Sequence, residues 1–202
     1  MLVVGFPAGA LQANCYLLAP GPDAACVIVD PGEDSAVRVA EVLAEHGLTP
    51  AAVLATHGHP DHVADAAVVT AAHDVPMWIH PADRALHDGG APADVRSLTG
   101  APLELADLVI DVDLVPGHTA GSVLFRVTTP EGGRLALTGD TLFAGSVGRG
   151  DPRRLGESLR DAVLPLPDDT VVLPGHGPAT TIARERAGNP FLSGARSVVP
   201  VP

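Results

Sequence analysis

Four side chains of the kinds that bind metal ions lie within six residues of one another. They are His57, His59, Asp61 and His62. On an extended segment His57 and His59 point to the same side, because side chains alternate with a period of two, whereas on a helix they would point about 200° apart. We therefore expect an extended segment through His59, followed by a bend at Pro60, a residue that fits the first position of a helix.

A helix that begins at Pro60 places Asp61 and His62 on its first turn, where the helix dipole favours a carboxylate. All four side chains can then converge at the carboxyl end of the preceding strand. Three further candidates each follow a predicted strand in a glycine-containing turn: His118, Asp140 and His176. A glycine next to a ligand lets the backbone turn sharply and approach closely.

Five histidines and two aspartates form a nitrogen and oxygen donor set that suits zinc, iron or manganese. Seven ligands are too many for one tetrahedral ion. They suit two ions about 3.5–4 Å apart, bridged by one carboxylate and one water. We expect two divalent metal ions, with zinc as the first choice and iron or manganese as the alternatives.

Short apolar runs between glycine and proline turns predict the elements that position these side chains. Strands are expected at 14–19, 25–30, 51–56, 75–80, 108–115, 123–128, 135–138 and 171–173. Helices are expected at 35–46, with Ser35 as N-cap and Gly47 as the stop, at 62–72 and at 155–163. The tail, 180–202, is expected to hold a short helix and an irregular end. Because strands and helices alternate but hairpins are also present, we expect a layered α/β fold with mixed sheets.

The composition excludes several classes of protein. With 202 residues, 46% apolar and 18% charged, the chain is too apolar for a disordered segment and suits one domain, 1–202. Two cysteines cannot form a disulfide scaffold. A net charge of −12 makes nucleic acids and membrane surfaces poor partners. No apolar run reaches about 18 residues, and the apolar start lacks basic residues, so we expect a cytoplasmic protein that begins with a buried strand pair.

Segment 56–62, with His118, Asp140 and His176, resembles the metal-binding motifs of the metallo-β-lactamase-fold hydrolases. The similarity is closest to the short glyoxalase II-like (hydroxyacylglutathione hydrolase-like) members and extends to 14–17, 30–32, 138–143, 145–149, 172–181 and 189–192. The resemblance implies a four-layer αββα sandwich with the metals at one edge of two mixed sheets. It also implies the ligands: His57, His59 and His118 for the first metal, Asp61, His62 and His176 for the second, and Asp140 as the bridge.

The resemblance implies hydrolysis of a small-molecule thioester by a metal-bound hydroxide. The substrate would be an S-2-hydroxyacyl conjugate of glutathione or of another small thiol. Asp61 would orient the hydroxide as well as bind metal, and Arg149 would anchor a substrate carboxylate. The longer glyoxalase II enzymes carry a C-terminal helical domain that helps to bind glutathione. We expect this chain to lack that domain, so the carrier thiol need not be glutathione.

Two other functions remain open from the sequence. The alternative enzyme is a mononuclear Fe(II) persulfide dioxygenase of the same fold, with iron held by His57, His59, His118 and Asp140. The non-enzymatic alternative is a structural or sensing metal. Seven ligands with room for water argue against it, since structural zinc sites are closed and four-coordinate. The net charge of −12 disfavours an RNA-processing nuclease.

Several single residues keep two interpretations at this stage. Asp30 is either a turn residue before a proline or a partner that orients a ligand histidine. Arg149 either anchors a substrate carboxylate through its planar guanidinium or pairs with Asp151 or another carboxylate. Cys15 and Cys26 lie in apolar runs and are expected to be inert buried thiols.

Overall fold

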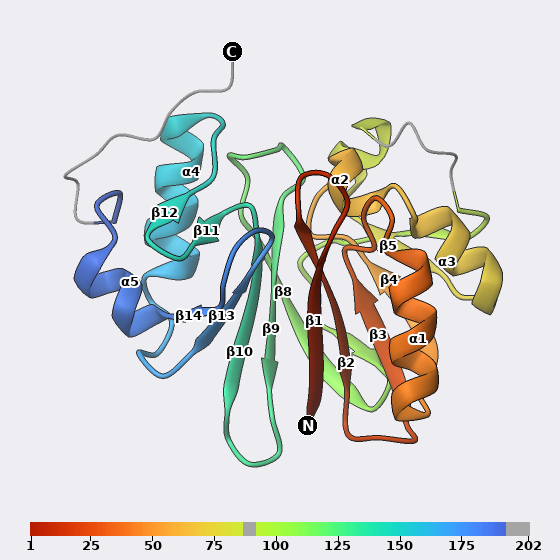
Figure 1. Cartoon of the computed structure of the whole chain (residues 1–202). Helices are drawn as coiled ribbons and strands as arrows, with labels where there is room; N and C mark the ends of the chain where they lie inside the picture. The colour runs from red at the N-terminus through yellow and green to blue at the C-terminus, as the bar shows by residue number, and fades with distance from the viewer. Residues whose placement is uncertain (87–91, 193–202) are drawn as a thin grey trace.

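The computed structural model describes residues 1–86 and 92–192, in which two six-stranded sheets pack against each other (Figure 1). The first sheet is mixed, because β1, β2 and β3 pair antiparallel whereas β3, β4, β5 and β6 pair parallel. Its strands, in spatial order, are β1 (Leu2–Ala8), β2 (Ala13–Ala19), β3 (Ala25–Val29), β4 (Thr49–Leu54), β5 (Met77–Ile79) and β6 (Val95–Ser97).

The second sheet is also mixed, since β10 and β13 pair parallel and every other neighbouring pair is antiparallel. Its strands, in spatial order, are β14 (Thr180–Thr181), β13 (Val171–Pro174), β10 (Arg134–Gly139), β9 (Val123–Thr128), β8 (Leu108–Leu114) and β7 (Leu103–Leu105). A small hairpin of β11 (Leu142–Phe143) and β12 (Ser146–Val147) follows β10.

Alternation along the strands separates an inner core from two outer cores. In β2, Tyr16 and Leu18 pack between the sheets with Phe125 of β9. Their neighbours Cys15 and Leu17 pack against the outer helices instead, because successive side chains of a strand point to opposite faces. A strand whose two faces are both covered reads as a continuous apolar run, as β2 does.

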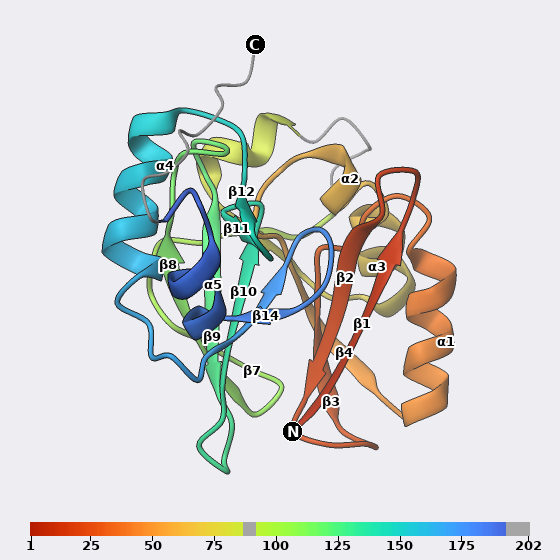
Figure 2. The same cartoon turned by 60° about the vertical axis from the view of Figure 1, so that its left-hand side comes forward.

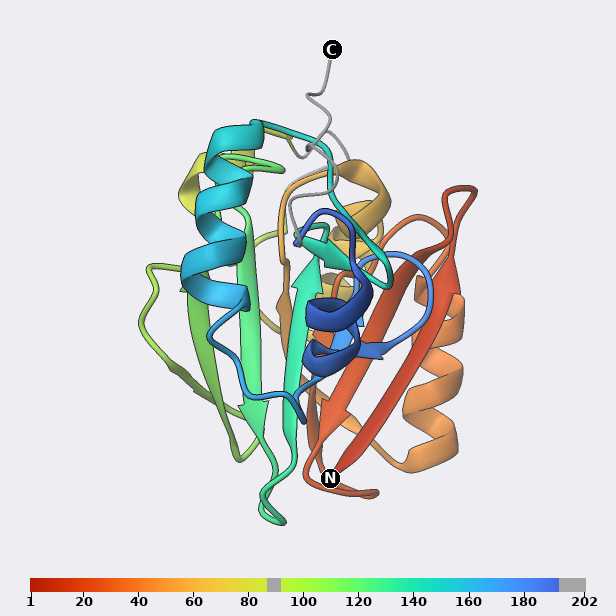
Figure 3. The same ribbon diagram turned by 90° about the vertical axis from the view of Figure 1, so that its left-hand side faces the viewer.

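Helices cover both outer faces of the sheets, which completes the expected αββα sandwich (Figures 2 and 3). The first sheet is covered by α1 (Ala36–His46) and α3 (Ala66–His73). The second is covered by α4 (Pro152–Ser158), its π-helical continuation η2 (Leu159–Val163) and α5 (Ile182–Gly188). The short helix α2 (Pro60–Val63) and the 3₁₀ helix η1 (Pro81–Leu86) lie beyond strand ends of the first sheet.

All eight strands that the sequence predicts are confirmed, with ends shifted by at most two residues. The strands that the sequence analysis missed are β6, β7, β11, β12 and β14. Each has only two or three residues, which is too short for a run of alternating residues to be recognised.

The single helix predicted for 62–72 is wrong, because the structure breaks it between α2 and α3. The backbone N–H of Asp65 donates to Pro31 O (3.1 Å), and its carboxylate accepts from Ala36 N (2.8 Å). Asp65 thereby caps α1, a role that the sequence analysis assigned to Ser35. Ser35 does occupy the N-cap position, but its side chain makes no capping bond. Gly47 ends the helix in the left-handed region as predicted, with φ of 65°.

The helix predicted for 155–163 begins three residues earlier, at Pro152, because Asp151 accepts from two N–H groups of the first turn. The short helix of the tail is confirmed as α5, and the irregular end at 193–202 lies outside the described residues. Cys15 and Cys26 are buried free thiols, as predicted. In the described part of the chain, no helix combines the length and the hydropathy needed to span a bilayer.

Candidate metal centre

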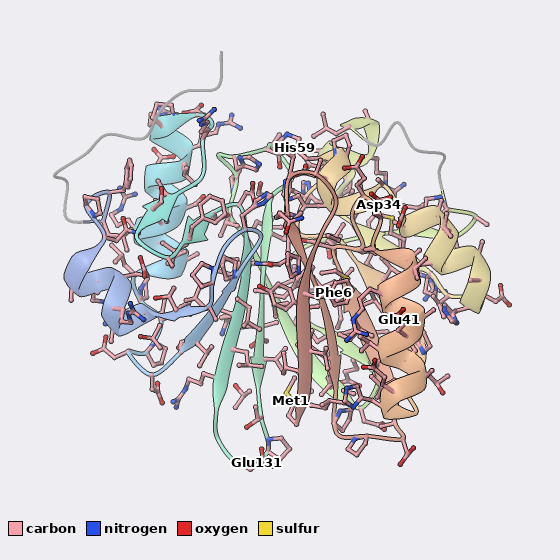
Figure 4. The ribbon with its side chains drawn as sticks, viewed as in Figure 1. Met1, Phe6, Asp34, Glu41, His59 and Glu131 are labelled. Atoms are coloured by element: carbon pink, nitrogen blue, oxygen red, sulfur yellow. The ribbon has the colours of Figure 1, made fainter. Side chains whose placement is uncertain are left out.

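The candidate residues lie at one edge of the sandwich, where strands from both sheets end, and Figure 4 labels His59 at this edge. After β4 the chain bends at Thr56 and His57, and His59 is extended, with φ −65° and ψ 143°. Pro60 then occupies the first position of α2, and Asp61 and His62 follow on its first turn. The extended conformation is therefore confirmed at His59, and the predicted bend is confirmed at Pro60, whereas the chain already bends at Thr56 and His57.

Three strands of the second sheet deliver the remaining candidates to the same edge. His118 follows the end of β8, Asp140 follows Gly139 at the end of β10, and His176 comes two residues after β13. Close approach requires a glycine here: a Cβ on Gly175 would collide with Asp140 Oδ1 and lie 2.8 Å from His62 Cε1. The candidates that follow strands in glycine-containing turns are thus brought together with those of the first sheet, as the sequence predicts.

The first group of donors consists of three imidazoles. His57 Nε2 lies 3.1 Å from His59 Nδ1, and His118 Nε2 lies 2.9 Å from the same Nδ1 atom. The three ligand atoms lie within 4.8 Å of one another. His57 is buried and the other two residues are half-buried.

The second group combines two imidazoles and one carboxylate. His62 Nε2 lies 3.3 Å from His176 Nε2, and Asp61 Oδ2 lies 3.5 Å and 3.3 Å from those two atoms. These ligand atoms also lie within 4.8 Å of one another.

Asp140 lies between the two groups. Its Oδ1 atom is 3.4 Å from His62 Nε2, and its Oδ2 atom is 3.5 Å from His118 Nε2. Oδ1 is buried and makes no hydrogen bond to any described residue. A carboxylate that presents one oxygen to each group suits the bridging position expected for it.

The outward-facing ring nitrogens show that this donor set fits divalent metal ions. Oxygen atoms lie beside four of them: Thr56 Oγ1 by His57 Nδ1 (3.1 Å), Asp30 Oδ2 by His62 Nδ1 (3.1 Å), Arg149 O by His118 Nδ1 (2.8 Å) and Leu11 O by His176 Nδ1 (3.2 Å). An imidazole that donates outward directs the lone pair of its other nitrogen inward. Partners of this kind fix the tautomer of metal-binding histidines.

Asp30 fills both of the roles that the sequence left open. It has a positive φ of 53° just before Pro31, as a turn residue can. Its Oδ1 accepts from Thr56 N (2.7 Å), and its Oδ2 accepts from Thr56 Oγ1 (2.6 Å) and faces His62. Because the Thr56 hydroxyl donates to Asp30, it can accept from His57 Nδ1, so one carboxylate orients ligands of both groups.

Two residues that position the His176 loop were missed as functional by the sequence analysis. Asn14 Nδ2 donates to Pro174 O and Gly177 O, both at 2.9 Å, and the hydroxyl of Tyr16 donates to Pro174 O at 2.8 Å. The segment 14–17 had been noted only as part of a family resemblance. No local signal could have paired it with a loop 158–163 residues away.

The protonation states suit metal binding. Burial lowers the pKa of His57 well below its usual value, which keeps it neutral. Burial alone would raise the pKa of Asp61, but the hydrogen bond from His176 and the nearby charge of His62 lower it to about 2. Burial likewise opposes protonation of His62, but the hydrogen bond to Asp30 and the neighbouring carboxylates raise its pKa to about 9. A metal ion at His62 therefore takes the place of a proton.

The alternatives for Arg149 are partly resolved by the structure. Its side chain is exposed and forms no ion pair with any described residue, while its backbone O accepts from His118. Asp151, the other partner considered, accepts instead from the N–H groups of Arg153 (3.0 Å) and Arg154 (3.1 Å) at the start of α4. The Arg149 side chain is thus exposed and has no ionic partner among the described residues, while its backbone contacts the first donor group.

Comparison with protein families places this geometry in a known context. The model of the metallo-β-lactamase superfamily matches residues 8–176. An uncharacterized protein of Mycobacterium tuberculosis is 43% identical over 96% of this chain and 99% of its own length. A probable metallo-hydrolase of Bacillus subtilis is 35% identical over 67% of this chain and 72% of its own. A hydroxyacylglutathione hydrolase of Haemophilus influenzae is 39% identical over 46% of this chain and 45% of its own.

Solved structures with the same architecture include a B3 metallo-β-lactamase, BLEG-1 (TM-score 0.82, 33% identity, covering 96% of this chain and 100% of that one). Another is TTHA1623 in a di-iron-bound form (TM-score 0.81, 37% identity, covering 94% and 100%). A third is ETHE1 from Myxococcus xanthus (TM-score 0.82, 27% identity, covering 96% and 85%). The three proteins share the fold of this chain but carry different names, so the fold alone does not identify a substrate.

Proposed function

This chain belongs to the metallo-β-lactamase superfamily, and from that premise we propose that it is a metal-dependent hydrolase that cleaves a small-molecule thioester. The donor set supports two ions, with His57, His59 and His118 as ligands of the first and Asp61, His62 and His176 as ligands of the second. Asp140 would serve both. A similar structure holds two irons, so we keep iron as an alternative to zinc.

One observation supports the proposal of a two-ion hydrolase. The second donor group is complete, since its three ligand atoms lie within 4.8 Å of one another, as those of the first group do. A dioxygenase with one Fe(II) at His57, His59, His118 and Asp140 can keep the second set without an ion, so the number of ions bound per chain separates the two enzymes. The partial similarity to a hydroxyacylglutathione hydrolase supports the thioester as substrate.

Bound divalent ions supply a water whose pKa is lowered to about 7 and a Lewis acid for the carbonyl oxygen. Asp61 remains ionised because its pKa lies at about 2, so it can accept a hydrogen bond from the attacking water and orient it. Asp30, Thr56 and the carbonyl oxygens behind the rings hold the imidazoles in place. A thiol with a pKa of about 8.5 leaves as a thiolate, so no general acid is required.

Two side chains at the rim would contact the substrate. The exposed guanidinium of Arg149 can bind a carboxylate through two parallel hydrogen bonds. The ring of Phe143 is half-buried, with its centroid 6.0 Å from that of His176, and offers an apolar wall to the acyl group. Together they favour a small acyl thioester with an anionic end.

The test is a panel of substrates with the metal content measured in parallel. Purified protein is assayed against S-2-hydroxyacyl conjugates of several small thiols, a chromogenic cephalosporin and a persulfide with oxygen uptake recorded. Two ions per chain, thioester cleavage and no oxygen uptake are expected. One iron per chain with oxygen uptake on persulfide would establish the dioxygenase, and cephalosporin hydrolysis alone would move the proposal to a β-lactam.

A further inference from the structure

A carboxylate outside the metal ligands links the two loops that carry the three-histidine group. Asp83 belongs to η1, after the first sheet's strand β5, and has 0% exposure. Its Oδ2 accepts from Gly58 N at 3.0 Å and from Thr119 Oγ1 at 2.6 Å, and its Oδ1 accepts from Gly121 N at 2.7 Å. It thus holds one donor on one loop and two on the other.

The donors that Asp83 binds are neighbours of the three histidines in the sequence. Gly58 is the residue between His57 and His59, and Thr119 directly follows His118. Asp83 therefore sits behind all three imidazoles of the first group without touching a ring. It contacts the backbone or hydroxyl beside each of them, so its position sets how far apart the two loops are.

The surrounding residues are fitted to this contact. A Cβ on Gly121 would lie 2.6 Å from Asp83 Oδ1, and a Cβ on Gly58 would collide with Asp83 O. Thr119 is held in turn by Ser122, whose Oγ accepts from Thr119 N (3.0 Å) and lies 2.7 Å from Thr119 Oγ1. The other backbone link between the two segments, Val123 N to Thr56 O (2.8 Å), lies on the strand side of the ligands.

We propose that Asp83 is a positioning residue that holds the loop of His57 and His59 and the loop of His118 at the separation at which three imidazoles share one metal ion. The inference rests on the proposed assignment of these residues as ligands. It predicts that Asp83 affects metal binding by the three-histidine group alone. Among the described hydrogen bonds, none joins the Asp83 side chain to Asp61, His62 or His176.

The substitution that tests this is Asp83→Asn. The amide has one accepting oxygen, so its NH₂ group must face either Gly121 N–H or Gly58 N–H, which leaves a buried donor without an acceptor. Outer partners of metal ligands typically change metal affinity by about 10–100-fold. We expect the loss in one of the two ion equivalents only.

The measurement is a cobalt(II) titration of the metal-stripped protein, followed by visible absorption, with zinc affinities from competition with a chromophoric chelator. The unaltered chain should bind two equivalents. Asp83→Asn should keep one and bind the other about 10–100-fold more weakly. His118→Ala, which removes an imidazole of the first group, identifies the spectrum of the ion that remains. Thr119→Val, with one donor removed, should weaken the same equivalent less.

Glu185→Gln is the matched control. Glu185 is a buried carboxylate that also accepts three hydrogen bonds, from Gly145 N, Thr180 Oγ1 and Asn189 Nδ2. The substitution Glu185→Gln should lower the unfolding temperature of the metal-free chain as Asp83→Asn does, but the variant should still bind both ions. The inference would be overturned if Glu185→Gln lost as much metal affinity as Asp83→Asn. It would also be overturned if Asp83→Asn and Thr119→Val both bound two ions tightly. An unaltered chain that binds no metal would instead contradict the proposed function.

Discussion

Asp30 and His62 form a buried pair, with Asp30 Oδ2 at 3.1 Å from His62 Nδ1 and side-chain exposures of 3% and 0%. The same carboxylate accepts from the backbone and hydroxyl of Thr56. It therefore fixes the ring of a ligand and the strand end that precedes the first histidine. The first prediction follows from this pair.

Asp30→Asn should weaken zinc binding by about 10–100-fold, mainly at the ion held by His62. The amide has one accepting oxygen, so its NH₂ group faces either His62 Nδ1 or Thr56 N–H. Either the ring loses its fixed tautomer or the strand end before His57 loses its acceptor. Competition with a chelator measures the effect. Asp151→Asn, at an exposed helix cap, is the control and should bind zinc normally. Normal binding by Asp30→Asn would show that the pair does not support the metal.

Asp61→Asn should lower kcat by about 10²–10⁴-fold, the usual contribution of a positioned base, with the fold intact. The amide no longer accepts a proton or a hydrogen bond as an anion does. Steady-state kinetics on the best thioester, with far-UV circular dichroism and metal analysis, measures this. Unchanged turnover at full metal content would remove Asp61 from the mechanism.

Metal removal should destabilise the protein. Five imidazoles and two carboxylates converge within a few ångströms, and a ligand bound only by the folded state adds about 2.7 kcal/mol at 100 times its Kd. The unfolding temperature should therefore rise with zinc concentration and fall on addition of a chelator. Calorimetry over a zinc series tests this, and a temperature independent of zinc would contradict metal binding by the folded chain.

Alkaline stability should depend on three neighbouring groups. The chain has no lysine, two cysteines and one tyrosine. Burial raises the pKa of Cys15, of Tyr16 and, to about 12, of Cys26. Above about pH 9 the unfolded chain releases protons that the folded chain retains, so stability is complete below pH 9 and falls as pH rises, by up to about 1.4 kcal/mol per unit and group.

Urea unfolding of the zinc-loaded protein between pH 8.5 and 10.5 measures this slope. Cys26→Ala removes one of the three groups and should make the slope shallower. A stability that rises with pH in this window would contradict the assignment.

Arg149→Ala should raise KM for thioesters that carry a carboxylate and leave kcat within about threefold, since binding that is equal in ground and transition states changes KM alone. Substrates without the carboxylate should be unaffected, which makes them the internal control. Arg153→Ala, an exposed arginine paired with Glu157, is the matched variant. Equal effects on both substrate classes would exclude a carboxylate contact.

The ligand cluster could be predicted because its information is local. The alternation of His57 and His59, the proline that starts α2, and a glycine beside each later ligand are all features of a few consecutive residues. The strands were predictable for a related reason: those with both faces covered read as short apolar runs.

The supporting contacts could not be predicted because they join distant segments. Asp83 meets its partners 25 to 38 positions away, and Asn14 meets Pro174 at a separation of 160. The cap of α1 comes from Asp65, which the sequence presents as an interior helix residue. Only the packed fold shows which polar groups lie opposite one another.

Each donor group takes at least one member from each sheet, with His118, Asp140 and His176 supplied by the second. His62 and His176 are 114 positions apart, so at about 5–20 residues per second the ribosome needs roughly 6–23 s to pass from one to the other. The nascent first half offers an incoming ion no complete group. Metal capture by these groups would consequently follow the synthesis of His118 for the first group and of His176 for the second.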